Sequence, residues 1–292
     1  MQIAVTGANG HLGIRLVESL LGEHQVRAIV RSGPAQVKLR QRFPTLEIQI
    51  VQYTDANQLG EALKGCDVVV HLVGIIKESK NSKFVEAHET SCEALVLAAA
   101  ASSIQRIVYM SIVGTGVDSN NACLKSKARA EAILQECDIP AVIIKVPMVL
   151  GEGNFASFAL RKNALSRFAF TFRANSLEQP IYAGDVIKAI ASAIGKSDIA
   201  ETVNLAGMES VTRKQLIQRA AGILHSSPVV VSLPISLGLS IAGLLEQLPN
   251  APLSRAMLGV LDHDDNIDVA DGCTEVGLEL TPLDETLGKV LL

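Results

Sequence analysis

Residues Cys123 and Lys127 stand four positions apart in the stretch NACLKSKARAEA, at the start of a predicted helix. A thiol at a helix start beside a lysine ammonium is expected to have a lowered pKa, because both surroundings favour the thiolate. Such a thiolate is a nucleophile and can exchange a proton. The spacing therefore fits an active site, a disabled active site or an ordinary surface turn, and the surrounding elements must decide between them.

A glycine-rich stretch, TGANGHLG, ends the first aliphatic run of the chain and opens an amphipathic helix. Its glycines, Gly7, Gly10 and Gly13, allow a tight turn and a close approach of the backbone to a pyrophosphate. Free N–H groups at the helix N-terminus meet the charge of that pyrophosphate. In this strand-to-helix context the spacing predicts a dinucleotide-binding loop. We interpret His11 within the loop as filler rather than as a catalytic group.

The second predicted strand ends in Val30, Arg31 and Ser32, where an NAD-binding fingerprint would place Asp or Glu for the ribose hydroxyls. A guanidinium cannot accept hydrogen bonds from hydroxyls, but it can hold a 2′-phosphate through two parallel N–H bonds. The sequence therefore favours NADP(H) over NAD(H). The alternative is a solvent-exposed arginine that simply comes after a strand.

Short aliphatic runs and helix-period segments alternate through the first half, which is typical of a doubly wound parallel α/β sheet. Aromatic residues are only 3% of the chain, so the core must be mainly aliphatic. We expect a dinucleotide-binding domain over 1–150 and a smaller C-terminal α+β domain, for a substrate or partner, over 151–292, partly interleaved with the first. The predicted strands are 3–7, 25–30, 47–52, 67–73, 106–111 and 141–147, and the predicted helices start near Leu12, span 56–64 and 83–101, and include 121–132.

The second half is less regular. We expect a turn at 151–154, a loop feeding a helix over 180–195 and a strand over 201–207. Thr212 and Gln215 have the spacing of a capping box, which predicts a helix from there through Leu224.

Residues 226–245 contain no charge, but Pro234 divides them into a short strand and a helix too short to span a bilayer. Leucine and isoleucine follow one face of that helix, and serine, glycine and glutamine follow the other. We interpret it as a core or domain-packing helix. The alternative is contact with a partner protein or a membrane surface through 235–248. The apolar face consists of Leu237, Ile241, Leu244 and Leu248, and the other face consists of Ser236, Ser240, Gly243 and Gln247.

The bulk composition excludes several classes of protein. A net charge of −4 and no basic run give nucleic acid no electrostatic reason to bind. Five cysteines at irregular spacings argue against a disulfide framework or a zinc site. The stretch LDHDDNIDVADGC lacks the glycine and the glutamate of a calcium loop, so we expect a solvated acidic turn and no metal. With no visible targeting segment, we expect a cytoplasmic protein.

Six motifs are spread over nearly the whole chain: TGANGHLG, DVVVHLVG, RIVYMSIVG, CLKSK, KVPMVLGEGN and IYAGDVIKAI. In these motifs the chain resembles the short-chain dehydrogenase/reductase superfamily, in its atypical and extended, NAD-dependent epimerase/dehydratase-like members. HLVGIIKESKNSKFVEAH and the C-terminal segment from LPISLGLSIAGLLEQLP are similar to the group that includes the nucleotide-binding accessory subunit of respiratory complex I. The resemblance implies a Rossmann-type sheet.

The resemblance also implies site residues. It implies a catalytic set of Ser111 and Lys127, with Cys123 at the place of the catalytic tyrosine, and it places Lys127 on the nicotinamide ribose. Pyrophosphate contacts are expected at Gly7, Asn9, Gly10, His11, Leu12 and Gly13, and 2′-phosphate contacts at Arg31 and Ser32. Adenine is expected near Gln52 and Tyr53, and the nicotinamide side near Leu72, Val73, Gly74, Ser111, Lys127, Pro147 and Val149.

The cysteine departs from the family pattern. A thiol reaches roughly 4–5 Å less far than a phenol, so it cannot place a proton at the substrate oxygen without a bridging water. Cys123 is then an inert residue, a sign of chemistry in which Ser111, Tyr109 or a water supplies the proton, or a redox-sensing thiolate. Two functions remain open: an NADP(H)-dependent oxidoreductase or sugar-nucleotide epimerase-like enzyme on an unknown small substrate, and a non-catalytic NADP(H)-binding scaffold, assembly factor or redox sensor.

Overall fold

The computed structural model describes residues 1–246, 254–260 and 262–292, so Gln247 and Leu248 lie outside the described residues. The chain divides into two compact units. The first comprises Met1–Lys145, Ile187–Val203 and Glu275–Gly277, and the second comprises Val146–Val186, Asn204–Thr274 and Leu278–Leu292. Each unit is therefore built from segments that are distant in sequence.

The first unit is built on a seven-stranded sheet in the order β11-β6-β5-β4-β1-β2-β3. Strand β1 pairs in parallel with both β2 and β4, which confirms the doubly wound prediction. Strand order reverses between β1 and β4, and ligands of such sheets bind outside the carboxyl ends at this point. The strands are β1 (Gln2–Thr6), β2 (Gln25–Val30), β3 (Glu47–Ile50), β4 (Val68–His71), β5 (Arg106–Ile112), β6 (Ala141–Val146) and β11 (Thr202–Asn204).

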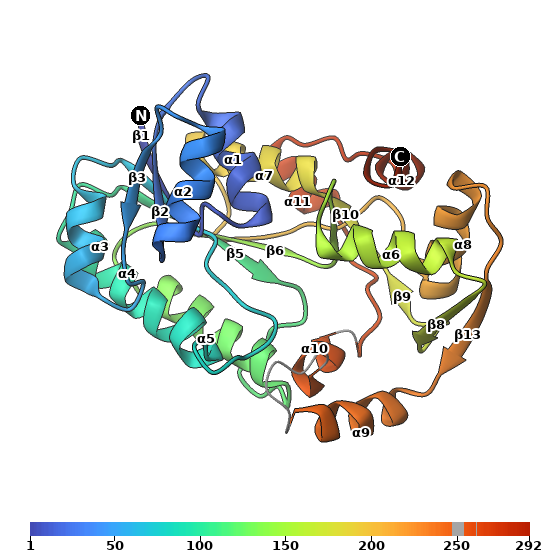
Figure 1. Ribbon diagram of the computed structural model, residues 1–292. Helices are drawn as coiled ribbons and strands as arrows, with labels where there is room; N and C mark the ends of the chain where they lie inside the picture. Colours follow the sequence, from blue (N-terminus) through green and yellow to red (C-terminus); the bar gives the residue numbers. More distant parts are fainter. Residues whose placement is uncertain (247–253, 261) are drawn as a thin grey trace. The chain divides into compact units, whose positions relative to one another are not determined.

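Helices cover both faces of this sheet. Helices α3 (Ala56–Leu63), α4 (Ser91–Ala100) and α5 (Ala122–Gln135) lie on one face, and α1 (His11–Leu20), α2 (Gly33–Arg42) and α7 (Ala183–Gly195) on the other (Figure 1). The core under α3, α4 and α5 is aliphatic and alanine-rich, as the composition predicted. Its largest fully buried side chain is Tyr109.

Two helical segments of the first unit differ from the sequence prediction. Helix α2 went unpredicted because it buries Leu39 alone and so lacks an apolar period. The long helix expected over 83–101 is divided: Val85–Thr90 forms a π-helix, η1, before α4 begins. His88 lies within this π-helical turn, and π-helical turns are frequent at functional sites.

The second unit combines short strand pairs with helices. Strand β8 (Phe168–Phe172) pairs in parallel with β13 (Val229–Leu233). The other pairs are β7 (Val149–Leu150) with β10 (Ile181–Tyr182), and β9 (Leu177–Glu178) with β12 (Val211–Thr212). The helices are α6 (Phe155–Leu165), α8 (Arg213–Ile223), α9 (Ile235–Leu245), α10 (Arg255–Val260), α11 (Ala270–Val276) and α12 (Leu283–Leu291). The capping box at Thr212 is confirmed.

Helix α9 buries small residues and exposes large apolar ones. Its buried residues are Gly238 and Ala242, whereas Leu237, Ile241 and Leu244 are exposed to solvent. The small residues face inward because α9 approaches its neighbours closely: a Cβ on Gly238 would lie 2.7 Å from the ring of Phe172. Among the described residues, no helix combines the length and the hydropathy needed to cross a bilayer.

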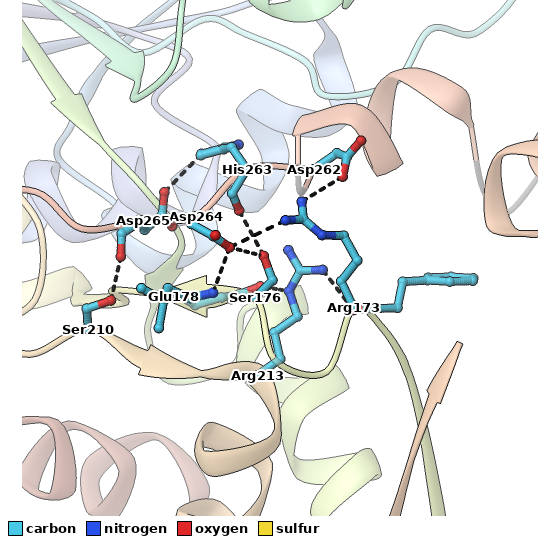
Figure 2. Close-up of polar contacts among 11 residues, drawn as sticks. Arg173, Ser176, Glu178, Ser210, Arg213, Asp262, His263, Asp264 and Asp265 are labelled. Atoms are coloured by element: carbon cyan, nitrogen blue, oxygen red, sulfur yellow. Dashed lines mark hydrogen bonds and ion pairs between the residues drawn. The ribbon is translucent and has the colours of Figure 1, made fainter. Parts of the chain in front are cut away.

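The acidic segment 262–273 is exposed at Asp262 and Asp264, as predicted, but both carboxylates are also bonded to distant residues. Asp262 pairs with Arg173 at 2.7 Å, and Asp264 accepts hydrogen bonds from the Ser176 hydroxyl and from a backbone N–H (Figure 2). Partners more than eighty positions away hold these carboxylates, which is why the local pattern could not reveal their role. No group of three potential metal ligands was found in the part of the chain that the structure describes.

Candidate dinucleotide site

The glycine loop joins β1 to α1 at the reversal point of the sheet. Gly7 has a φ of +68°, a left-handed conformation that favours glycine. The N–H of Gly10 donates to the carbonyl of Gly7 at 2.9 Å, which closes the turn. Helix α1 then begins with Gly10 as its N-cap and without a side-chain cap. Backbone N–H groups are therefore available at this helix start, as a pyrophosphate site requires.

The same loop has no space for a side chain at Gly13 and little space at Gly7. A Cβ on Gly13 would lie 2.4 Å from the carbonyl oxygen of Gly7 and 2.7 Å from the Cα of Ala8. A Cβ on Gly7 would lie 3.1 Å from the backbone of Leu72, just beyond β4. The loop is therefore packed against both its own helix and the end of β4, as expected of a cradle for a dinucleotide.

Tyr53 holds this loop from the β2 side. Its hydroxyl accepts from the N–H of Gly7 at 3.1 Å and donates to the carbonyl of Ile29 at 3.0 Å. Burial raises the pKa of the phenol to about 12, so it stays neutral and can do both. The expected position of Tyr53 beside the adenine stays a prediction, and its role under the loop was not predicted. No local pattern links residues 46 positions apart.

Arg31 and Ser32 come directly after β2 and are both exposed. Ser32 is the N-cap of α2, and its hydroxyl caps no backbone N–H. A guanidinium, a hydroxyl and a helix start thus lie within three consecutive residues at the carboxyl edge of the sheet. Such groups suit an additional phosphate. Gln52 lies beyond the next strand and is also exposed.

Lys127 is buried beneath the segment that comes after β4. Its Nζ donates to the hydroxyl of Tyr109 at 2.9 Å and to the carbonyl of Met110 at 2.8 Å. Burial lowers the pKa of this amine to about 8. A Cβ on Gly74 would lie 3.1 Å from Nζ, so the backbone at Gly74 passes close to the amine. The fold thus brings Lys127, Gly74 and β5 together.

Ser111 is bound to Glu131, a residue that was not predicted to belong to the site. The Ser111 hydroxyl donates to Glu131, which is buried one helical turn beyond Lys127 on α5. The other oxygen of Glu131 lies 2.7 Å from the Nζ of Lys145 and accepts from Thr115. A glutamate four residues after Lys127 shares a face of the helix with it, and that spacing is the signal available in the sequence.

Cys123 is buried at the first turn of α5. Its Sγ contacts the carbonyl oxygen of Ile75 at 3.5 Å. Burial raises the pKa of the thiol to about 11, and the opposing effect of Lys127 is smaller. The predicted decrease in this pKa is therefore wrong. Burial destabilises the thiolate by more than the nearby ammonium of Lys127 stabilises it.

His88 anchors the same segment from η1. Its Nε2 lies 3.1 Å from both the backbone N and the backbone O of Ile75. Burial lowers the pKa of the imidazole to about 3, so the ring is neutral, and the tautomer determines whether Nε2 accepts from the N–H or donates to the carbonyl of Ile75. Together, Cys123 and His88 hold the backbone that comes after Gly74.

His71 is a core residue. It is fully buried, its Nδ1 lies 2.8 Å from the Thr6 hydroxyl, and its ring stacks on Tyr109. Burial lowers its pKa to about 3, which leaves it uncharged.

The remaining expected site residues are divided between the two units. Asn9 is exposed, and His11 and Leu12 are partly buried at the start of α1. Leu72 and Val73 continue from β4 toward Gly74, within the first unit. Pro147 and Val149 belong to the second unit, where Val149 pairs with Ile181.

A protein-family model described as NAD(P)H-binding matches residues 7–164, slightly more than half of the chain. Among curated proteins, subunit 9 of the mouse mitochondrial NADH dehydrogenase [ubiquinone] 1 alpha subcomplex is 23% identical over 240 residues. That match covers 79% of this chain and 62% of the relative, so the chain spans less than two thirds of the relative's length. A ceramide reductase from Caulobacter vibrioides is 25% identical over 242 residues, which cover 80% of this chain and 73% of the relative.

Among solved structures, the UDP-glucuronic acid 4-epimerase of Bacillus cereus in complex with NAD superposes with a TM-score of 0.76. The two chains are 19% identical, and the superposition covers 100% of this chain and 97% of the epimerase. A nucleoside-diphosphate-sugar epimerase from Staphylococcus aureus gives a TM-score of 0.74 at 19% identity, over 99% of this chain and 100% of that one. At this identity the likeness concerns the fold.

Proposed function

The chain belongs to the NAD(P)H-binding family, and from this premise we propose that it binds NADP(H) along the carboxyl edge of β1, β2 and β4. The observation that carries the proposal is the packing of the glycine loop, which leaves no space for a Cβ at Gly13 and little at Gly7, beside a start of α1 that has no side-chain cap. The geometry of the glycine loop thus supports the cofactor class that the family model indicates. The bound nicotinamide would supply hydride transfer.

The residues immediately after β2 favour NADP(H) over NAD(H). Arg31 supplies a positive charge where a ribose-binding carboxylate would stand, and Ser32 leaves the start of α2 without a side-chain cap. A 2′-phosphate would meet complementary charge there, whereas the free hydroxyls of NAD(H) would gain little from a guanidinium.

We further propose that tyrosine-type proton transfer is absent. A fully buried thiol with a pKa of about 11, in contact with the Ile75 carbonyl, is a poor proton donor to a substrate and a poor redox sensor. The function supported best is a cofactor-binding scaffold or assembly factor. The name of the mouse relative, a subunit of a larger complex, agrees with such a role.

The Ser111 arrangement favours a second candidate, an oxidoreductase or epimerase-like enzyme. In this case the Ser111 hydroxyl would take the proton of a substrate alcohol while passing its own proton to Glu131. Lys145 and Thr115 hold the second oxygen of Glu131, which would keep the carboxyl in place. The relatives and structural neighbours named as a reductase and as epimerases agree with this candidate.

The test of cofactor binding is a thermal shift with NADPH and with NADH, on the wild type and on Arg31→Ala. NADPH should stabilise the wild type more than NADH does, and Arg31→Ala should remove the difference. Equal stabilisation by both cofactors would reject the NADP(H) preference, and stabilisation by neither would reject the site.

The test of catalysis is NADPH oxidation across a panel of carbonyl compounds, together with chromatographic detection of UDP-sugar epimerisation in the presence of NADP+. A tightly bound cofactor without turnover, and no gain from Cys123→Tyr, supports the scaffold. Turnover that Ser111→Ala and Glu131→Gln both abolish, with cofactor binding retained, supports the enzyme.

A further inference from the structure

The surface of α6 and β8 has an unusual composition. Between positions 155 and 170, every exposed side chain is a phenylalanine, a leucine, an arginine or a lysine. We name this set the aromatic–basic surface: Phe155, Phe158, Arg161, Lys162, Leu165, Arg167, Phe168 and Phe170. Its four phenylalanines are 75%, 66%, 49% and 60% exposed, in chain order. Exposing that much aromatic area to water is costly, so this surface is expected to be covered in function.

Local structure explains how α6 exposes these side chains. Phe155, Phe158, Lys162 and Leu165 follow one face of the helix at helical spacing. The opposite face is already used, because Leu160 and Ala164 pack in the core of the second unit. The exposed apolar face of α6 is therefore additional to the face that folding requires.

The strand β8 repeats this division with a period of two. Ala169 points into the same core, while Phe168 and Phe170 point outward. The neighbouring strand β13 places Val229 beside Phe168, and Val229 is 56% exposed. Both elements thus bury small or aliphatic residues and expose aromatic ones.

The charge of the segment differs from that of the protein. Residues 155–173 contain four basic residues and no acidic residue, within a chain of net charge −4. Arg173 is paired with Asp262, whereas no ion pair of Arg161, Lys162 or Arg167 occurs with the described residues. The Arg167 guanidinium lies 5.6 Å from the ring centre of Phe168. Positive charge and aromatic area therefore occur side by side.

We propose that the exposed face of α6, with Phe155, Phe158, Lys162 and Leu165, docks this protein on an anionic lipid bilayer. Aromatic rings would enter the boundary between headgroups and acyl chains, while Arg161, Lys162 and Arg167 meet lipid phosphates. Protein interfaces are also rich in phenylalanine and arginine but are depleted of lysine, so Lys162 within the exposed face of α6 favours lipid over a protein partner. Helix α9 also exposes leucines, but it has no charged residue over 226–245, so the charge favours α6 as the docking surface.

The experiment is flotation of the full chain with large vesicles. One set is phosphatidylcholine alone, and the other contains about one third phosphatidylglycerol. Binding is expected to the anionic vesicles and to weaken in high salt, because the contribution of the basic residues is screened. The variant Phe155→Ser/Phe158→Ser should lower the partition coefficient by at least about tenfold, since each buried phenylalanine contributes to insertion. Lys162→Glu should lower it by about fivefold or more.

Matched controls lie in the first unit. Leu97→Ser removes an apolar side chain that is 64% exposed on α4, and Lys38→Glu reverses an exposed charge on α2; neither should change vesicle binding. Absence of binding to anionic vesicles would overturn the proposal, as would equal losses in the controls. Self-association that the phenylalanine variant abolishes, without vesicle binding, would identify a protein interface instead. NADPH stabilisation is measured separately and should be the same in every variant.

Discussion

The amine of Lys127 lies 2.9 Å from the hydroxyl of Tyr109 and 2.8 Å from the carbonyl oxygen of Met110. Tyr109 is fully buried, and its pKa is raised well above the ordinary value of a phenol, chiefly by that burial. The phenol is therefore an acceptor for Lys127 and not a general acid. The hydroxyl of Tyr109 and the carbonyl of Met110, both from β5, thus hold the amine of Lys127 next to the backbone of Gly74.

Removal of the phenol oxygen is expected to destabilise the fold. Tyr109→Phe leaves a buried N–H of Lys127 without its acceptor, which costs about 1–3 kcal/mol of unfolding free energy. Urea unfolding measures the loss. The control is Tyr182→Phe, because that hydroxyl bonds Glu152 in an exposed contact at 2.7 Å. Equal effects of both substitutions would contradict the buried role of Tyr109.

Lys127 is expected to make the stability depend on pH in the alkaline range. Burial lowers its pKa from 10.5 to about 8, so between these values the unfolded chain holds a proton that the folded chain has released. The penalty for burying the charged amine is fully present below pH 8 and is relieved as pH rises toward 10.5. The gain is roughly 3 kcal/mol, at about 1.4 kcal/mol per pKa unit.

Urea unfolding of the wild type and of Lys127→Met at about pH 7 and about pH 10 isolates this contribution. The wild type should gain relative to the variant on going to the higher pH. Lys38→Met controls for the loss of one positive charge from an exposed site. A difference between wild type and Lys127→Met that does not change with pH would mean that the amine is not buried.

Glu131 is expected to be a structural centre of its network. Glu131→Gln weakens the hydrogen bond from Ser111 and leaves Lys145 without its carboxylate, so a loss of about 1–3 kcal/mol is expected. Chemical denaturation is the measurement. Glu61→Gln removes an exposed pair with Lys64 and should have an effect within experimental error. A neutral Glu131→Gln would argue against this network.

Because the glycine loop is closely packed, one methyl group added at Gly13 is expected to lower both the stability of the fold and the binding of NADPH. Gly13→Ala places a Cβ 2.4 Å from the Gly7 carbonyl oxygen, so the loop must shift. We expect a lower melting temperature and the loss of stabilisation by NADPH. Gly22→Ala is the matched control, since nothing lies within 4 Å of the Cβ that it adds. Retained NADPH stabilisation in Gly13→Ala would remove the main support for the site.

The burial of Cys123 predicts slow alkylation. In the folded protein at neutral pH, the thiol is almost entirely protonated and shielded from solvent, so iodoacetamide should modify it far more slowly than the partly exposed Cys137. Peptide mapping by mass spectrometry after timed labelling measures both rates. Faster labelling of Cys123 than of Cys137 would restore the redox-sensor hypothesis.

The alternation of strands and helices in the first unit was predictable because it rests on local periodicity. The expected strand over 25–30 coincides with β2, and the expected helix over 56–64 differs from α3 by one residue. Prediction was poorer where the pattern is weak: α2 and most short strands of the second unit were missed, although the short strand expected before Pro234 is β13. Helix α9 was found, but the sequence did not show which of its two faces is buried, since that choice depends on neighbouring elements.

The sequence by itself determined the glycine loop, its position between a strand and a helix, and the arginine at the end of β2, because each depends on residues close together in the chain. Tertiary structure alone decided that Tyr53 lies under that loop, that Glu131 binds Ser111, and that the pKa of Cys123 rises. The physical reason is that burial and hydrogen bonding come from distant segments. For Cys123 in particular, desolvation opposes the charge of Lys127, and only the packed structure shows which effect is larger.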